Sequence, residues 1–217
     1  PAPRLRHARD TGWIVLVFDH VDNRHADLSP GSPDLPSVVN LVRAVGALPA
    51  RADTPDVAGY VAELQVKTAR LLVSHPDGEL QRVIAAATGA FDLRELAGPQ
   101  LVHYDLHSGN LLVTADGTVA VDWSFACKGA AWIDAALLVP RLIAAGHSPA
   151  DAELVVSALP AWRSAPRAAV TGLAAYWTAF RAYKAIYGPE PARETRTRAA
   201  RAGQAWVQHR MSTRAGA

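Results

Sequence analysis

Hydrophobic positions recur along most of this chain at the spacing of an amphipathic helix, and in a few places they form short runs typical of strands. Over residues 36–48 the apolar side chains fall on one face of a helix. The same spacing, bounded by Pro, Gly or a capping residue, predicts further helices. These are expected at residues 54–74, 79–96, 130–145, 148–159, 166–187 and 191–211.

The helix at residues 54–74 has a defined start and a defined apolar stripe. Thr54 is expected to cap it, with Pro55 at the first helical position, where the missing N–H has no intrahelical partner to lose. The stripe is expected to comprise Val57, Tyr60, Val61, Leu64, Ala69 and Leu72. In the helix at residues 130–145, Pro140 is expected to produce a kink.

Two stretches have the pattern of strands. Residues 12–19 form a continuous apolar run, which predicts a buried strand, preceded by another strand that ends near His7. Residues 111–113 and 119–121 are also apolar, and they flank an Asp-Gly pair at residues 116–117. An Asp-Gly pair between two apolar runs predicts a β-hairpin.

Polar residues at the open end of this hairpin suggest its chemistry. If the turn centres on Asp116, then Asn110 and Asp122 lie opposite each other. Amide and carboxylate oxygens are hard ligands suited to Mg²⁺. Asp105, on the preceding loop, is free to orient a hydroxyl nucleophile. One Asp on the acceptor, with an Asn and an Asp on the metal, is the division of labour in phosphoryl transfer.

The pattern His103-x-Asp105-x4-Asn110, followed by Asp122, resembles the catalytic and metal loops of the protein-kinase-like superfamily. It is closer to the aminoglycoside phosphotransferase and choline kinase-like small-molecule kinases, which usually read His-Gly-Asp-Leu-His-x-x-Asn. Here Tyr104 replaces the Gly of that motif.

Further residues fit the same branch. The second metal motif is Asp-Trp-Ser at residues 122–124 instead of Asp-Phe-Gly, and Gly-x-x-Trp-x-Asp-x-Ala follows at residues 129–136. The resemblance implies an α+β, protein-kinase-like fold. Residues 1–30 would be a remnant of the N-terminal lobe with the hinge, and residues 31–217 would be a mainly helical C-terminal catalytic lobe carrying the hairpin. Most of the N-terminal lobe would be missing.

The resemblance also implies ATP and Mg²⁺ as cofactors and assigns roles to individual residues. By this resemblance, Asp105 would be the catalytic base, and Asn110 and Asp122 would be the Mg²⁺ ligands. His103 would support the loop, and Asp134 would brace it from the next helix. The backbone of Asp19 and Val21, in the hinge, would contact the adenine. A plain strand followed by a polar turn explains residues 18–23 equally well.

The front half of a kinase nucleotide site has no counterpart in this sequence. No Gly-rich phosphate loop precedes the hinge, and the three lysines, Lys67, Lys128 and Lys184, all lie downstream of it. We expect the missing parts to lie upstream of Pro1 in a longer protein, and nucleotide affinity to be weakened in this chain alone.

The implied reaction is transfer of the γ-phosphoryl group of ATP to a hydroxyl of a small molecule. An aminoglycoside, another antibiotic, an amino alcohol or a sugar all remain open as acceptor. A polycationic aminoglycoside would require an acidic cleft. The acidic residues after residue 147 are only Asp151, Glu153, Glu190 and Glu194.

Two other classes of function remain open. A truncated or non-catalytic kinase-like module would bind a ligand without turnover. A metal-dependent hydrolase could use His103, Asp105 and His107, because alternate residues of an extended strand point the same way. Three ligands from five consecutive residues would be cramped.

Composition and charge limit the partners. The formal net charge is only +2, and the arginines near the C-terminus are interrupted by Glu194, which predicts a solvated helix face and no nucleic-acid partner. No apolar run reaches about 18 residues, so no membrane span is expected. The single cysteine, Cys127, fits a reducing compartment, and a cytoplasmic location is expected.

Overall fold

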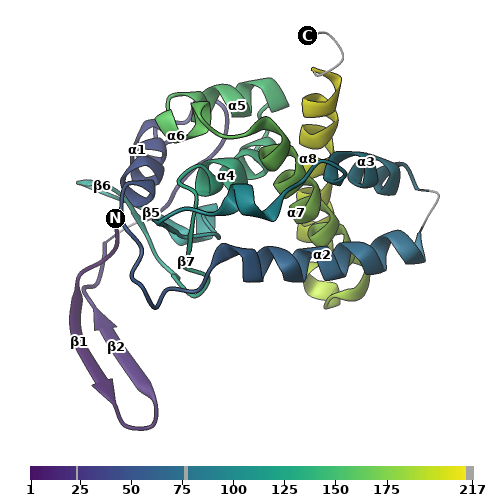
Figure 1. The fold of residues 1–217 in the computed structure, drawn as a ribbon. Coiled ribbons are helices and arrows are strands. Elements are labelled where there is room, and N and C mark those ends of the chain that lie inside the picture. The colour runs from purple at the N-terminus through teal and green to yellow at the C-terminus, as the bar shows by residue number, and fades with distance from the viewer. Residues whose placement is uncertain (23, 76–77, 214–217) are drawn as a thin grey trace.

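The structure, a computed structural model, describes residues 1–22, 24–75 and 78–213. It is mainly helical, with short antiparallel strands (Figure 1). The α-helices are α1 (Leu35–Gly46), α2 (Val57–Ser74), α3 (Glu79–Thr88), α4 (Ile133–Ala144), α5 (Pro149–Ser157), α6 (Pro160–Arg163), α7 (Arg167–Tyr187) and α8 (Arg193–Ser212). Short 3₁₀ helices are η1 (Leu93–Leu96), η2 (Ser108–Asn110) and η3 (Glu190–Ala192).

The strands form three small antiparallel sheets, with the orders β1-β2, β3-β5-β6 and β4-β7. The strands are β1 (Leu5–Asp10), β2 (Ile14–Phe18), β3 (Arg24–His25), β4 (Gln100–Val102), β5 (Leu111–Thr114), β6 (Gly117–Ala120) and β7 (Cys127–Gly129). The α+β class is therefore the one that the sequence pattern predicted.

The β1-β2 hairpin extends away from the helical body (Figure 1). Both strands occur where the sequence predicted them, but the expected burial of β2 is wrong. Trp13 is 82% exposed and Ile14 is 76% exposed, and every residue of both strands is exposed. An apolar run predicts a strand that can be buried, but burial requires a second layer of structure. Among the described residues, no second layer covers this two-stranded sheet.

The start of α2 differs from the expectation. Its capping residue is Asp56, whose side chain accepts a hydrogen bond from the N–H of Ala58 at 2.9 Å, and Thr54 does not cap. The C=O of Pro55 accepts a hydrogen bond from the N–H of Lys128 in β7 at 2.7 Å. Asp56 is extended, with ψ of 138°, and forms an isolated bridge with Lys128, so the helix begins later than the local signal indicated.

The apolar stripe of α2 also differs in its second half. Thr68 and Leu71 are buried, whereas Ala69 is exposed and Leu72 is half-buried. Thr68 is accommodated because its hydroxyl donates to the C=O of Leu64 at 2.7 Å, which satisfies the polar group inside the core.

The remaining helices follow the predicted pattern with shifted ends. The single helix expected at residues 79–96 is divided into α3 and η1, with Gly89 at the division. Helix α4 begins at Ile133, three residues later than expected, and Pro140 lies inside it without ending it.

Helix α4 is the centre of the main core. Residues 133–142 are all buried, and α1, α5, α7 and α8 pack around them. A smaller second core lies where α2, α3, α7 and α8 meet. Its buried members are Leu71, Ile84, Ala179, Ala182 and Ala200.

Residues just before the expected boundary at residue 30 also pack in the main core. Ala26 and Leu28 are buried there, and the Nε2 atom of His147 lies 3.0 Å from the C=O of Leu28. The segment that connects β3 to α1 is therefore anchored to the helical body. The division at residue 30 stays a prediction.

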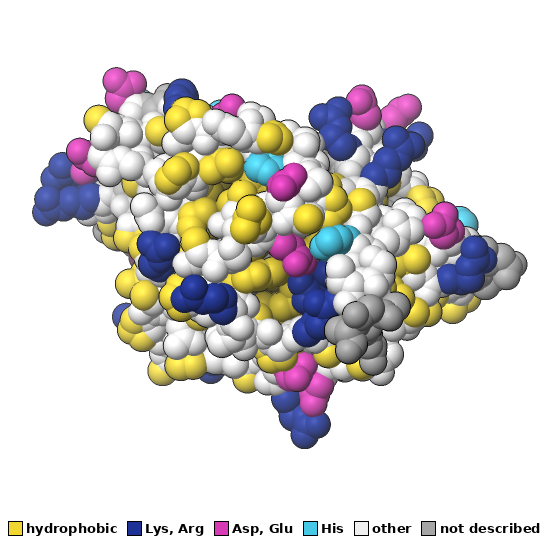
Figure 2. Space-filling view, turned by 90° about the horizontal axis from the view of Figure 1, so that it is seen from above, with side chains coloured by type: hydrophobic (Ala, Val, Ile, Leu, Met, Phe, Trp, Pro, Cys, Tyr) yellow, Lys and Arg dark blue, Asp and Glu magenta, His cyan; other side chains and the backbone are white. Residues whose placement is uncertain are grey.

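The surface carries charges of both signs. On the face shown in Figure 2, basic side chains stand in separate groups, several of them next to acidic side chains, without merging into one basic patch. Within the described ranges, no helix combines the length and the apolarity needed to cross a bilayer.

Close packing of α7 against α8 can be tested with a pair of glycine substitutions. A Cβ on Gly203 would clash with the Oγ1 of buried Thr178, so Gly203→Ala is expected to destabilise the fold by about 1–3 kcal/mol. Gly59→Ala in α2 meets no atom within 4 Å and is expected to stabilise by about 0.5–1 kcal/mol. Urea unfolding of both variants checks the prediction, and equal effects would contradict it.

Candidate active site

The loop between β4 and β5 and the end of β6 meet at the open end of the hairpin. Leu111 pairs with Ala120 and Thr114 with Gly117. The C=O of Asn110 accepts a hydrogen bond from the N–H of Val121 at 3.0 Å. Asn110 is therefore opposite Val121, and the expected pairing with Asp122 is wrong by one residue. The turn is centred between residues 115 and 116 instead of on residue 116.

The buried carboxylate of Asp134 holds the start of this loop. Its two oxygens accept hydrogen bonds from the backbone N–H groups of His103 and Tyr104, both at 2.8 Å. Burial raises the pKa of Asp134, whereas the two N–H bonds lower it by stabilising the charged form. The first turn of α4 thus fixes two consecutive peptide groups of the loop.

Tyr104 has a left-handed backbone conformation, with φ of 71°. This conformation is costly for a residue with a side chain, by roughly 1–2 kcal/mol, and the family motif usually has Gly here. The hydrogen bond from the Tyr104 N–H to Asp134 helps to maintain this backbone conformation. The ring of Tyr104 stacks on Tyr60 with a centroid separation of 5.4 Å.

His103 connects the loop to the end of β6 through both ring nitrogens. Nε2 lies 3.0 Å from the C=O of Val121, and Nδ1 accepts from the N–H of Asp105 at 3.4 Å. Because a carbonyl oxygen only accepts, Nε2 carries the proton. The ring is buried against Trp123, with a centroid separation of 4.5 Å.

This arrangement leaves the hydrolase alternative without support. Both nitrogens of His103 are used within the protein, so this residue offers no lone pair to a metal. Across the described ranges, no three His, Cys, Asp or Glu side chains are grouped so that they could hold a metal ion.

Asp105 is held by arginines from two helices. Its Oδ1 accepts a hydrogen bond from Arg141 of α4 at 2.6 Å, and Arg181 of α7 lies 4.0 Å from the same oxygen. The other oxygen, Oδ2, is 3.7 Å from Nε2 of His107. Arg141 is buried and also donates to the C=O of Leu137.

The sequence reasoning missed Arg141, although a signal for it existed. Asp134 and Arg141 are seven residues apart, so they lie on one face of α4. They are the charged residues of a helix that is otherwise apolar around its whole circumference. Charged side chains inside such a helix are expected to have specific partners, and both contact the same loop.

Asn110 and Asp122 offer oxygen atoms at the end of the hairpin. The Nδ2 of Asn110 donates to the C=O of Asp105 at 3.0 Å, which directs its Oδ1 elsewhere. Asp122 is exposed, with φ of 58°, and its Oδ1 accepts from the Oγ and N–H of Ser124. These bonds lower the pKa of Asp122. An amide oxygen and an ionised carboxylate fit a hard divalent cation such as Mg²⁺.

The two hinge candidates, Asp19 and Val21, lie just after β2. The N–H of Asp19 donates to the C=O of Arg4 at 2.9 Å, and its side chain pairs with Arg6. Both contacts are within the β1-β2 hairpin. Val21 follows and is half-buried.

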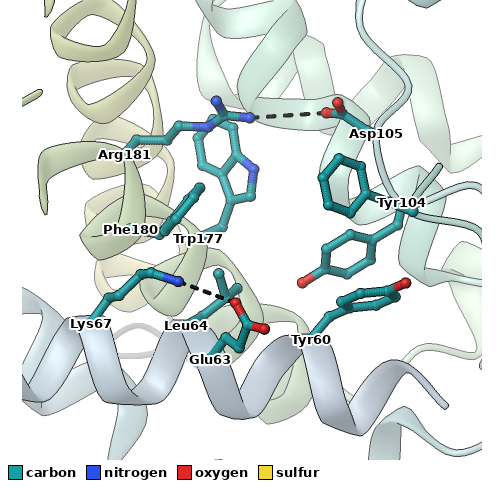
Figure 3. Close-up of a pocket in the computed structure, with 10 residues that line it drawn as sticks. Tyr60, Glu63, Leu64, Lys67, Tyr104, Asp105, Trp177, Phe180 and Arg181 are labelled. Atoms are coloured by element: carbon teal, nitrogen blue, oxygen red, sulfur yellow. Dashed lines mark hydrogen bonds and ion pairs between the residues drawn. The ribbon is translucent and has the colours of Figure 1, made fainter. Parts of the chain in front are cut away.

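A cavity of about 250 Å³ opens beside Asp105, between α2, α7 and the loop (Figure 3). Half of its lining residues are aromatic. The lining residues are Tyr60, Glu63, Leu64, Lys67, Tyr104, Asp105, Phe125, Trp177, Phe180 and Arg181.

Comparison with known proteins agrees with this geometry. Residues 1–169 match the family model described as "Phosphotransferase enzyme family". Among solved structures, the chain is similar to the crystal structure of an aminoglycoside phosphotransferase from Alicyclobacillus acidocaldarius subsp. acidocaldarius, with a TM-score of 0.64 and 15% identity. The match covers 98% of this chain and 77% of that one. No curated protein matches the sequence.

The hydrogen bonds from the loop to Asp134 can be tested by substituting Asp134. Asp134→Ala leaves two buried N–H groups without an acceptor, and we expect a loss of about 2–4 kcal/mol in the free energy of unfolding. Asp56→Ala removes an exposed carboxylate that accepts one N–H at the start of α2, and is expected to cost about 1 kcal/mol. Urea titration measures both, and a smaller loss for Asp134→Ala than for Asp56→Ala would contradict the prediction.

Proposed function

Because this chain belongs to the phosphotransferase enzyme family, we propose that it transfers the γ-phosphoryl group of ATP to a hydroxyl of a small molecule. The observation that carries this proposal is the position of Asp105. Arg141 holds one oxygen of its carboxylate, and the residue also lines the cavity between α2 and α7. A hydroxyl bound in the cavity would therefore lie beside this carboxylate.

The proposed role of Asp105 is to align the acceptor hydroxyl and to receive its proton. The hydroxyl oxygen forms the new bond to the γ-phosphorus, and the bond from that phosphorus to the ADP oxygen breaks, with its electron pair leaving on ADP. The ion pair with Arg141 keeps the carboxylate in one orientation. Positioning matters more than basicity here, because the transition state of phosphoryl transfer is loose.

Asn110 and Asp122 would hold Mg²⁺ through the oxygens that point away from their protein partners. When bound, the ion would neutralise charge on the phosphates. The hydrogen bond from Asn110 to the Asp105 carbonyl couples the proposed ligand to the loop that carries the proposed base.

For the nucleotide, the proposed adenine contacts are the backbone groups of Asp19 and Val21. The N–H of Asp19 already donates to Arg4, so its contact would have to come from its C=O. Residues 1–30 would then correspond to part of the N-terminal lobe and hinge of a kinase-like fold, and residues 31–217 to its C-terminal lobe.

Substitution of the two aspartates separates nucleotide binding from turnover. Asp122→Ala is expected to weaken Mg²⁺-dependent ATP binding by at least about tenfold, because it removes a charged metal ligand. Asp105→Asn is expected to preserve ATP binding and to lower phosphoryl transfer by about 10²–10⁴-fold. Calorimetric titration of ATP with and without Mg²⁺ measures the first effect, and ADP release with an accepted alcohol measures the second.

Asp116→Asn is the matched control, since Asp116 is an exposed carboxylate at the other end of the same hairpin. It is expected to change neither quantity. Normal Mg²⁺-dependent binding by Asp122→Ala would refute the metal assignment. Full turnover by Asp105→Asn would refute the catalytic one. Mg²⁺-dependent ATP binding by the unsubstituted chain without transfer to any alcohol would favour the non-catalytic binding module.

A further inference from the structure

The cavity beside Asp105 is small, and half of its lining residues are aromatic. Its volume of about 250 Å³ lies just below the range of roughly 300–1,000 Å³ common for small-molecule sites. Figure 3 shows Tyr60 and Tyr104 on one side and Trp177 and Phe180 on the other, with Asp105 at one end. Such walls favour a flat, apolar group of about the size of a single ring.

Cationic side chains of the protein already lie against the aromatic rings of this cavity. The guanidinium of Arg181 lies 4.8 Å from the ring centre of Trp177, and the Nζ of Lys67 lies 5.4 Å from that of Phe180. An amino alcohol or amino sugar would have to compete with these cations for the ring faces and would meet their positive charge.

The carboxylates that line the cavity are already paired. Glu63 forms an ion pair with Lys67 at 3.2 Å, and Asp105 forms one with Arg141 at 2.6 Å. Glu153, one of the few acidic residues after residue 147, is tied to Arg210 at 2.6 Å and does not line this cavity. The lining thus has two carboxylates and two cations, and Arg141, which pairs with Asp105 from outside the lining, adds a third cation.

Two buried donors in the cavity wall lack an acceptor among the described residues: the hydroxyl of Tyr104 and the Nε–H of Arg181. Figure 3 shows the Tyr104 hydroxyl directed toward the cavity. Burial raises the pKa of Tyr104, so its hydroxyl stays protonated and can donate. Burial lowers the pKa of Arg181 to about 10, so it stays charged at neutral pH.

A buried donor without an acceptor is unfavourable, and a ligand oxygen would satisfy it. We propose, on the basis of the proposed function, that the acceptor is a flat, largely apolar alcohol, uncharged or anionic, whose carbonyl or carboxylate oxygen binds Tyr104 and Arg181. Its hydroxyl faces Asp105. A polycationic amino sugar does not fit this site, because the cavity offers aromatic surface and free donors instead of free carboxylates.

A pair of probes of the same shape and opposite charge tests this proposal. 4-(Hydroxymethyl)benzoate carries a carboxylate, and 4-(aminomethyl)benzyl alcohol carries an ammonium group on the same benzyl alcohol frame. We expect the full chain, titrated without nucleotide, to bind the carboxylate probe at least about fivefold more tightly, the scale of one hydrogen bond. Ligand-observed NMR is suited to the weak affinity of such small probes.

Two variants show whether the preference comes from the proposed donors. Tyr104→Phe keeps the ring and removes only the hydroxyl, and is expected to weaken the carboxylate probe by about three- to tenfold without strengthening the cationic one. Arg181→Met is expected to abolish the preference for the anion. Tyr176→Phe is the matched control, because Tyr176 packs against Phe91 and does not line the cavity. It is expected to bind both probes as the unsubstituted chain does.

Equal affinity for the two probes, a preference for the cation, or absence of binding by both would overturn the proposal. So would an unchanged preference in Tyr104→Phe, which is expected to fold even if Arg181→Met does not. The failure of the proposed function would be seen separately, as an absence of Mg²⁺-dependent ATP binding, because the probe titrations contain no nucleotide.

Discussion

The hydrogen bonds from two consecutive peptide groups to the Asp134 carboxylate are the constraint on which the candidate site depends. They join the loop that precedes β5 to the first turn of α4, at the centre of the main core. Burying a carboxylate is costly unless its oxygens are bonded, so helix and loop can move only together.

Helix α4 holds the loop at a second point, through another residue on the same face. Two turns after Asp134, Arg141 reaches the side chain of Asp105, and residues 133–142 of the helix are all buried. A helix packed in this way has little freedom to rotate or shift. One rigid element therefore sets the backbone of the loop and the orientation of the carboxylate that would face the acceptor. The ring of His103 then connects the same loop to the end of the hairpin.

Tyr104 belongs both to the loop, where its backbone is left-handed, and to the wall of the cavity. A glycine would adopt this backbone without strain but would contribute no wall and no donor. With tyrosine, a ring stacks on Tyr60, and a hydroxyl without an acceptor among the described residues lies in the cavity wall. The departure from the motif glycine thus falls at a residue that lines the cavity beside Asp105.

Periodicity and local chemistry determined much of this protein from the sequence alone. The helical segments, the hairpin and the polar residues of the loop were predicted, because side-chain spacing, caps and turns act over a few residues. Tertiary structure decided what depends on distant partners. The bond between Pro55 and Lys128 moved the start of α2, the lack of a covering layer left β2 exposed, and Arg141 reached Asp105 across 36 residues. No local pattern contains such contacts, since their energy exists only after the core has brought the segments together.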